Sequence, residues 1–347
     1  MQKIKLGIVF GGMSTENEVS VKSAMSIIKN IDIEKYELFK IYITKEGEWQ
    51  EYLEGTDGLE NKKIENVIEF LRKLDVAFPI LHGLYGEDGT IQGLFELLKL
   101  PYVGCGVLAS SVGMDKVYTK IVFEKAGLKQ TKYEYIRKFK DKYIYVNNNF
   151  DEEVLSIDEV TEKIVRNIKF PMYIKPSNSG SSIGINKAKN VEELKRYIEI
   201  ASKFDKKILI EEGIIGREVE CAVLGNEDVI ASGIGEVLPA DEYYSYEAKY
   251  NNSNSVTEIP AKNIDNKLVE EIKKRAVKAF KAIDGKGLSR VDFFIEEETN
   301  EIYINEINTL PGFTSISMYP KLFEEYGISY KELIDRIIML GISKNFN

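Results

Sequence analysis

Residues 288–318 restrict the fold more than any other stretch, because they have the pattern of a β-hairpin. Strand-forming side chains fill the runs Phe293–Ile295 and Ile302–Ile304, and the polar residues 296–300 between them suit a turn. The two arms of a hairpin are neighbouring strands of one sheet.

Polar residues in this hairpin fall at alternating positions. Strand side chains alternate between faces, so Arg290 and Asp292 share one face, as do Glu306 and Asn308. If the two faces coincide, an arginine, two carboxylates and an amide oxygen meet on one surface. Mg²⁺ prefers oxygen ligands and usually binds through few carboxylates plus substrate phosphates. Any one of these acids could be a solvated surface residue, but the set, followed by the N-T-L-P-G turn, predicts a metal site.

Composition limits the classes of protein to consider. The 347 residues allow two or three domains of about 100–200 residues each, and 44% hydrophobic residues indicate a folded chain. A net charge of −9 gives no basic footprint for nucleic acid. The N-terminus lacks signal-peptide features, no apolar run suits a membrane helix, and Cys105 and Cys221 have no metal-ligand spacing. We expect a cytoplasmic protein without nucleic-acid or membrane partners.

Predicted strands alternate with helices in the first part of the chain. An apolar run, Ile4–Phe10, leads through a glycine turn into a helix whose start has a capping-box pattern, Thr15 with Glu18. Further strands are expected at Leu38–Thr44 and at 75–82, the second followed by a glycine-rich loop and an amphipathic helix. This alternation predicts a mostly parallel sheet with helices on both faces, whose ligands lie beyond the carboxyl ends of the strands.

Two polar residues stand at that expected edge. Glu16 is in the first turn of the predicted helix, where the helix dipole favours an acid without any ligand. His82 is the single histidine of the chain and ends a predicted strand beside a glycine-rich loop. Each residue is explained equally well by a structural and by a functional role when it is considered alone.

A loop in the middle of the chain is a candidate phosphate cover. Residues 177–184 contain four serines and two glycines, and Lys175 precedes them at the end of an apolar strand. Backbone N–H and hydroxyl groups of such loops can surround phosphate oxygens, although a simple hairpin turn has the same composition. The chain has neither a Walker P-loop motif nor a G-x-G-x-x-G fingerprint, which disfavours P-loop enzymes and nicotinamide-dependent dehydrogenases.

The remaining elements are expected from periodicity and turn residues. They are a single helix over 107–127, strands at Tyr143–Val146 and Lys207–Glu212, helices at Ile157–Ile168, after Ile264 and at Tyr330–Leu340, a variable excursion at Lys138–Val154, and a tyrosine-rich loop at 235–254 with the length of a lid.

Motifs in sequence order resemble those of the D-alanine–D-alanine ligases of the ATP-grasp superfamily. They are F-G-G-M-S-T-E-N-E-V-S (10–20), L-H-G-L-Y-G-E-D-G-T-I-Q-G (81–93), G-M-D-K (113–116), K-P-S-N-S-G-S-S-I-G (175–184), Y-E-A-K-Y (246–250) and R-V-D-F with N-E-I-N-T-L-P-G-F-T-S (290–315). The resemblance implies an α/β (α+β overall), three-domain ATP-grasp fold. It would comprise an N-terminal doubly wound parallel-sheet domain (1–105), a central ATP-grasp small domain (106–212) and a C-terminal domain with the hairpin (213–347).

The resemblance implies ligation of two D-alanines with ATP, through an acyl phosphate, for peptidoglycan and cell wall synthesis. Two Mg²⁺ ions, which Mn²⁺ could replace, would be held by Asp292, Glu306 and Asn308 and would neutralise phosphate charge. The family is commonly dimeric, so a homodimer is expected.

The same resemblance implies roles for further residues. For the nucleotide they are Lys116 and Lys175 on the α- and β-phosphates, Ser179 to Ser182 over the phosphates, Glu211 and Glu218 at adenine and ribose, and Lys249 at the γ-phosphate. For the amino acids, the resemblance implies one hydrogen-bonded set of Glu16, Ser181 and Tyr250, and it implies that His82 lies near the first D-alanine. Arg290 and the N–H of Gly312 would bind the oxyanion. Ser317 and Met318 would lie around the second D-alanine.

The identity of the second substrate is the open alternative. Tyr250 in the lid differs from the histidine of D-lactate-using relatives, and apolar Met318 differs from the arginine of D-serine-using ones. Ile316, where many members have histidine, removes a polar group near that site. Glu212 also stands where a lysine is common. A D-alanyl-D-serine ligase, or another ATP-grasp carboxylate–amine ligase, is therefore the second enzyme reading, and a non-catalytic nucleotide-binding protein is the reading from another class.

Overall fold

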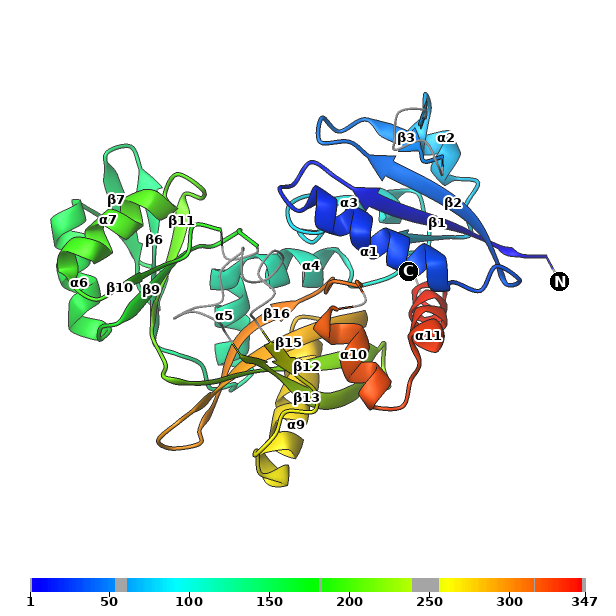
Figure 1. Ribbon diagram of the computed structural model, residues 1–347. Coiled ribbons are helices and arrows are strands. Elements are labelled where there is room, and N and C mark those ends of the chain that lie inside the picture. The colour runs from blue at the N-terminus through cyan, green and yellow to red at the C-terminus, as the bar shows by residue number, and fades with distance from the viewer. Residues whose placement is uncertain (1, 54–60, 181–182, 239–255, 315, 345–347) are drawn as a thin grey trace.

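The computed structural model describes residues 2–53, 61–180, 183–238, 256–314 and 316–344. These residues form three β-sheets, one after another along the chain, with helices packed on them (Figure 1). No helix among the residues so described is long and apolar enough to cross a bilayer.

The first sheet has the strand order β4-β3-β2-β1-β5. Its strands are β1 (Ile4–Gly11), β2 (Tyr36–Ile43), β3 (Trp49–Glu51), β4 (Lys62–Lys63) and β5 (Val76–Pro79), and its helices are α1 (Asn17–Asn30), α2 (Val67–Leu71) and α3 (Thr90–Leu97). The expected parallel pairing is confirmed for β1, which lies between β2 and β5. The more polar β3 and β4 add an antiparallel edge.

Two local expectations for this region are wrong. Helix α1 has Glu16 at its N-cap and no side-chain cap hydrogen bond, so Thr15 and Glu18 form no capping box. Strand β5 ends before His82, which therefore lies in the loop that follows the strand. Both residues predicted at the ligand edge, Glu16 and His82, still lie beyond the carboxyl ends of the parallel strands.

The second sheet is antiparallel, with the order β10-β9-β11-β6-β7-β8. Its strands are β6 (Tyr133–Phe139), β7 (Lys142–Val146), β8 (Glu152–Leu155), β9 (Met172–Pro176), β10 (Asn186–Ala188) and β11 (Lys207–Glu212), and it packs against α6 (Ile157–Asn167) and α7 (Val191–Ala201). The stretch 138–154, expected as a variable excursion, supplies β7 and β8 and buries Tyr143 and Tyr145 in the core of this sheet.

The single helix expected over 107–127 is two helices, α4 (Val107–Met114) and α5 (Lys116–Lys125). Asp115 between them has an extended backbone, and its Oδ1 accepts hydrogen bonds from the N–H groups of Val117 and Tyr118. The break occurs because Asp115 acts as the N-cap of the second helix. Residue Lys116 consequently sits at a helix start instead of in a helix interior.

The third sheet has the order β14-β13-β12-β15-β16 and contains the predicted hairpin. Its strands are β12 (Gly216–Gly225), β13 (Ile230–Leu238), β14 (Val256–Glu258), β15 (Gly287–Glu296) and β16 (Ile302–Asn308), with helices α9 (Asn266–Ala282), α10 (Met318–Glu325) and α11 (Tyr330–Ile342). Helix α9 packs its buried residues against one face, in a core that includes Val291 and Phe293.

On the opposite face of the third sheet, the side chains change from apolar to polar along the strands. At one end Ala222, Leu224 and Leu288 are buried in a core that also contains residues of β1, β5, α1 and α11, so this end is joined to the first sheet. Beyond them on the same face come Arg290 and Asp292, as strand alternation requires. The fold thus anchors one end of the hairpin in apolar contacts, and Lys175 of the second sheet contacts Asn305 of the hairpin.

Candidate active site

Strand register brings the polar residues of the hairpin into facing rows. Arg290 pairs with Asn308 and Asp292 pairs with Glu306, so the two predicted faces coincide. On the other side of β15, Asp292 lies opposite Glu220 of β12. Three carboxylates therefore cross neighbouring strands in one row.

Two cationic side chains offset part of the negative charge of this row. Arg290 donates from Nε to Oδ1 of Asp292 (2.8 Å) and from a terminal nitrogen to Oδ2 (2.7 Å), and its Nε is 2.9 Å from Oε2 of Glu220. Burial alone would lower the pKa of Arg290, but the charges of Asp292 and Glu220 outweigh it and hold that pKa well above the usual value. Lys116 Nζ lies 3.7 Å from Oε2 of Glu306.

The donor set at the hairpin suits a hard divalent cation. Asp292, Glu306 and Asn308 offer two carboxylates and an amide oxygen on one face. Across the described ranges, no group of three or more His, Cys, Asp or Glu side chains is arranged to hold a metal ion. A cation bound by two carboxylates and one amide needs further oxygens, and a substrate's phosphates are the usual source for Mg²⁺.

Two lysines share one buried glutamate on the facing sheet. In Glu211 of β11, Oε1 lies 2.6 Å from Nζ of Lys120 and Oε2 lies 2.6 Å from Nζ of Lys175. The hydroxyl of Thr131 donates to Oε1 at 2.9 Å. Burial raises the pKa of Glu211, but the two lysine charges prevail and lower it far below its usual value. The cluster keeps a net positive charge, which suits it to bind an anion such as phosphate.

Several of these groups line one cleft, which is formed by α4, α5, the second sheet and β16. The cleft is lined by Gly113, Lys116, Thr119, Lys120, Lys175, Leu209, Glu211, Asn305 and Glu306. Lys175 Nζ reaches Oδ1 of Asn305 at 3.5 Å, so a lysine of β9 contacts the hairpin directly. Basic groups thus line the same narrow cleft as Glu306, one of the predicted metal ligands.

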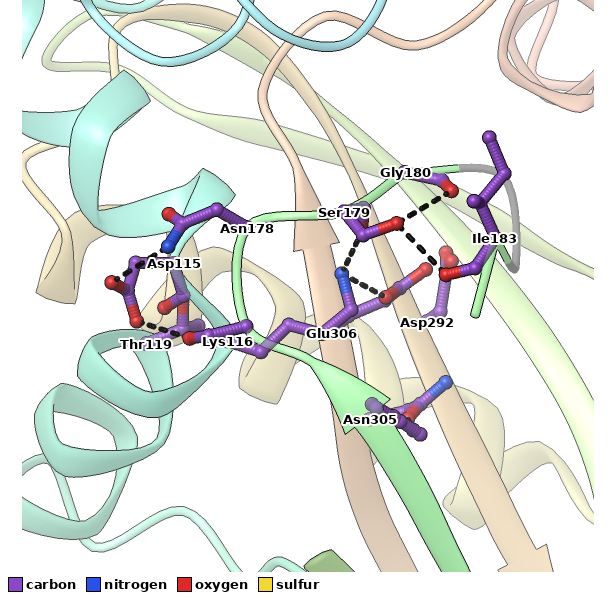
Figure 2. Close-up of polar contacts among 12 residues, drawn as sticks. Asp115, Lys116, Thr119, Asn178, Ser179, Gly180, Ile183, Asp292, Asn305 and Glu306 are labelled. Carbon is purple, nitrogen blue, oxygen red and sulfur yellow. Dashed lines mark hydrogen bonds and ion pairs between the residues drawn. The ribbon is translucent and has the colours of Figure 1, made fainter. Parts of the chain in front are cut away.

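Lys116 connects the serine loop with the hairpin (Figure 2). Its Nζ donates to the carbonyl oxygen of Ser179 at 2.7 Å and lies near Glu306. Asp115, the neighbouring N-cap, accepts from Ser177 Oγ at 2.7 Å and pairs with Lys207 at 2.5 Å. The start of α5 is therefore fastened to the base of the serine loop.

Glu16 lies where the first sheet meets the serine loop. Its side chain is buried, and a Cβ atom on Gly83 or on Gly180 would lie 2.7 Å or 3.0 Å from its Oε2. Three motifs that are far apart in the sequence therefore converge on one carboxylate. This position gives Glu16 a place beside the phosphate-cover candidate as well as beside the His82 loop.

His82 is buried and held on both sides of its ring. Nε2 lies 3.1 Å from Ser23 Oγ, and Nδ1 lies 3.7 Å from Oε1 of Glu87. Burial would lower the pKa of His82, but the hydrogen bond and charge of Glu87, with the charge of Glu16, outweigh it and raise that pKa. Ser23 Oγ also accepts from the N–H of Phe313 at 3.4 Å, which links His82 to the turn at the end of the hairpin.

The turn after β16 is ordered by its own hydroxyl groups. Ser317 Oγ accepts from Thr314 N at 3.0 Å and lies 3.0 Å from where a Cβ on Gly312 would stand. Met318 is buried, and its sulfur would lie 2.5 Å from a Cβ on Gly235 of β13, so it packs into the sheet. Gly312 and Ser317 thus adjoin one another, whereas the side chain of Met318 is directed into the core.

The other predicted site residues are placed as follows. Ser179 Oγ donates to the carbonyl of Ile183 at 2.9 Å, and Glu218 lies on the same face of β12 as Glu220. Four predicted residues lie outside the described part of the chain: Ser181, Ser182, Lys249 and Tyr250.

Sequence reasoning missed several residues of this site. They are Ser23, Glu87, Asp115, Lys120 and Glu220. Helical spacing offered a signal for Lys120, because it lies one turn after Lys116 on α5. Strand alternation offered one for Glu220, which shares a face with Glu218.

Comparisons with known proteins agree with this architecture. Residues 5–105 match the family model described as D-ala D-ala ligase N-terminus, and residues 122–339 match the one described as D-ala D-ala ligase C-terminus. D-alanine–D-alanine ligase B of Clostridium tetani is 51% identical over 353 residues, covering 99% of this chain and 95% of the relative. D-alanine–D-alanine ligase of Acetivibrio thermocellus is 48% identical over 376 residues, covering 99% and 96%.

Solved structures give the same result. VanG D-Ala:D-Ser ligase from Enterococcus faecalis has a TM-score of 0.85 at 34% identity, covering 98% of this chain and 100% of that one. The D-alanine–D-alanine ligase from Coxiella burnetii has a TM-score of 0.81 at 30% identity, covering 99% and 94%. The fold is therefore the ATP-grasp fold, and the class is that of ATP-dependent ligases. Within that class, the chain belongs to the D-alanine–D-alanine ligase family.

Proposed function

We propose that the protein joins two D-alanines to D-alanyl-D-alanine with hydrolysis of ATP to ADP and phosphate, for peptidoglycan precursor synthesis. The observation that supports this most is the narrow cleft lined by Lys116 and Lys120 of α5, Lys175 of β9 and Glu306 of β16. Basic groups on one side and oxygen donors on the other are what a nucleotide triphosphate with Mg²⁺ requires.

The phosphates of ATP would be bound from both sides of this cleft. Lys116 and Lys175 would contact the α- and β-phosphates, Glu211 and Glu218 would line the adenine and ribose pocket, and the Ser179–Ser182 loop would cover the chain of phosphates. Asp292, Glu306 and Asn308 would hold Mg²⁺, in two ions that Mn²⁺ could replace, and the metal when bound neutralises phosphate charge.

The first chemical step activates a carboxylate. The carboxylate oxygen of the first D-alanine attacks the γ-phosphorus, the bond to the bridging oxygen breaks, and ADP leaves, giving an acyl phosphate. Glu16 would pair with the ammonium group of this D-alanine, and His82 would lie near its carboxylate. Lys249 would be directed at the γ-phosphate from the lid.

The second step forms the peptide bond. The deprotonated amine of the second D-alanine attacks the acyl carbon, and inorganic phosphate leaves as the tetrahedral intermediate collapses. Arg290 and the N–H of Gly312 would stabilise the oxyanion, which is preorganised electrostatic stabilisation. Glu16, Ser181 and Tyr250 would form the hydrogen-bonded set that connects the lid to the amino acids.

A second candidate is ligation of D-alanine to D-serine. The similarity to VanG D-Ala:D-Ser ligase, at 34% identity over 98% of this chain, keeps this reading open. Met318 does not carry a preference for a methyl side chain at the second site, because its side chain is directed into the core, and an apolar pocket rejects an added hydroxyl only weakly.

The cellular and quaternary setting completes the proposal. We infer a cytoplasmic homodimer whose domains divide after residues 105 and 212. Release of phosphate on mixing protein, ATP, Mg²⁺ and D-alanine tests the activity. Phosphate and dipeptide formed in equal amounts are expected, whereas ATP binding without phosphate release would favour a non-catalytic protein.

A further inference from the structure

We propose that Glu220 is a positioning residue that holds Arg290 in place while Asp292 turns to bind a divalent cation. The inference rests on the proposed function, because it takes Asp292 as a metal ligand. It concerns how this chain resolves a competition between a guanidinium and a cation for one carboxylate.

The competition is visible in the hydrogen bonds of Arg290. Its guanidinium uses both oxygens of Asp292, at 2.8 Å and 2.7 Å, in a two-point contact. Asp292 has 3% of its side chain exposed and Arg290 16%, so neither charge has much water around it. A cation that takes an oxygen of Asp292 must therefore displace part of this contact.

Breaking that contact would be unfavourable if Arg290 had no second partner. A buried charge that loses its counter-ion is strongly destabilising, because nothing replaces its hydration. Glu220 supplies the second partner, since its Oε2 lies 2.9 Å from Nε of Arg290 and its side chain is only 6% exposed. Arg290 can keep this contact while Asp292 is engaged elsewhere.

The strand register separates the two tasks in space. Glu220 lies on β12 and Glu306 on β16, with Asp292 between them on β15. A cation held by Asp292 and Glu306 would lie toward β16, so Glu220 is on the side of Asp292 away from it. The β12 residue opposite Arg290 itself is Ala222, whose small side chain leaves the guanidinium room to lean toward Glu220.

The chain provides a matched control for removing the Glu220 charge. Glu236 on β13 is also buried, at 6% exposure, and its Oε1 accepts from Nε of Arg217 at 2.7 Å. This pair has the same chemistry in the same sheet, but Arg217 also donates to the backbone carbonyls of Lys262 and Asn263, away from the cleft. Glu236→Gln therefore reproduces the loss of a buried charge without touching the hairpin.

The test measures ADP binding by calorimetry at increasing Mg²⁺, with thermal unfolding of every variant as a check on folding. Mg²⁺ should tighten ADP binding to the unaltered protein, and Asp292→Asn should abolish that effect. We define the midpoint as the Mg²⁺ concentration that produces half of the tightening of ADP binding. We expect Glu220→Gln to raise this midpoint by about tenfold, the scale of coupling between contacting charges. Glu236→Gln should leave it unchanged. A Glu220→Gln midpoint equal to that of the unaltered protein would overturn the inference.

A double variant separates positioning from simple loss of negative charge. If Glu220 acts through Arg290, Glu220→Gln should have no further effect on the midpoint in an Arg290→Met background. A persisting effect would mean that Glu220 acts on the cation directly, and would overturn the inference. If Glu220→Gln fails to fold, Glu220→Asp takes its place, because it keeps the charge but moves it away from Arg290. Glu220→Asp should also raise the midpoint, and an unchanged midpoint would count against the proposal. Absence of any Mg²⁺ effect on the unaltered protein would instead contradict the proposed metal site itself.

Discussion

Ser23 Oγ lies 3.1 Å from Nε2 of His82, within the buried contact between α1 and the loop after β5. The same hydroxyl oxygen accepts from the N–H of Phe313, while the carbonyl of Phe313 accepts from Tyr330 at 2.6 Å. The turn that carries Gly312 is therefore held at both polar groups of Phe313, by Ser23 of α1 at the N–H and by Tyr330 of α11 at the carbonyl. Ser23 connects the two proposed amino-acid sites.

Ser23→Ala should lower kcat/KM for D-alanine by about tenfold, because it leaves the Phe313 N–H and His82 without this partner. The KM for ATP should stay unchanged, since Ser23 does not line the cleft proposed to bind the nucleotide. Steady-state kinetics with each substrate varied in turn measures the split. Thr161→Ala, which removes a buried hydroxyl on α6, is the control and should alter neither parameter. Equal losses for both substrates would contradict the positioning role.

Glu211→Gln should destabilise the fold by about 3–5 kcal/mol at neutral pH, because Lys120 and Lys175 lose their shared buried counter-ion. Urea unfolding monitored by circular dichroism measures the change. Glu332→Gln removes one partner of the exposed Glu332–Arg336 pair and should have little effect. A similar small loss in both variants would show that the buried cluster is not a stabilising ion pair.

The pH dependence of that difference follows from the lowered pKa of Glu211. Burial raises this pKa, but the charges of Lys120 and Lys175 lower it below the ordinary value of 4.5. A carboxyl with a depressed folded pKa stabilises the fold fully above its unfolded pKa, and the contribution is lost as pH falls through the folded value. The stability gap between the unaltered protein and Glu211→Gln should be constant from about pH 5 to 8 and shrink at lower pH. A gap that widens on acidification would contradict the assignment.

Glu306→Gln should reduce ligation by about 100-fold or more, the scale of losing one preorganised electrostatic contact. The fold should remain intact, because Glu306 is partly exposed and its contact with Lys116 is long, at 3.7 Å. Dipeptide formation at several Mg²⁺ concentrations measures the effect. Glu301→Gln makes the same chemical change on the same hairpin, at an exposed pair with Lys129, and should retain activity. Full activity of the Glu306 variant would refute the metal assignment.

Gly180→Ala should raise the KM for D-alanine by about tenfold, because its Cβ would press on Glu16 Oε2 at 3.0 Å and displace that carboxylate. Thermal stability should change little. Gly93→Ala on α3, where no atom beyond the neighbouring residues and the helix's own backbone lies within 4 Å of the new Cβ, is the matched control and should leave KM unaltered. If the two variants behave alike, the close approach of the serine loop to Glu16 has no role in amino-acid binding.

The hairpin was predictable because strand alternation is a local rule. Alternation predicts that Arg290 and Asp292 share one face of the first arm, and that Glu306 and Asn308 share one face of the second. The observed register shows in addition that these two faces are the same face of the sheet. The break between α4 and α5 was not predictable from periodicity, because apolar spacing continues across Asp115. Asp115 is also bound by Ser177 and Lys207, which periodicity does not connect to it.

Long-range pairs explain the other omissions. Lys120 on α5 is recognisable as part of the cleft only once Glu211 of β11 is seen beside it. Glu220 has the pattern of any acid on a half-exposed strand until Arg290 is placed next to it. Candidate residues could be named from the sequence where a motif pointed to them, whereas Lys120 and Glu220, whose contacts come from tertiary neighbours, could not.

The most direct measurement is product analysis with ATP, Mg²⁺, D-alanine and equal amounts of D-serine and D-lactate as competing acceptors. Mass spectrometry of the products, with phosphate release followed in parallel, identifies both the reaction and the acceptor. D-alanyl-D-alanine as the main product, with one phosphate released for each dipeptide, is the predicted result. A predominance of D-alanyl-D-serine would contradict the proposed acceptor, and the absence of any dipeptide or ester with intact ATP would contradict the ligase function.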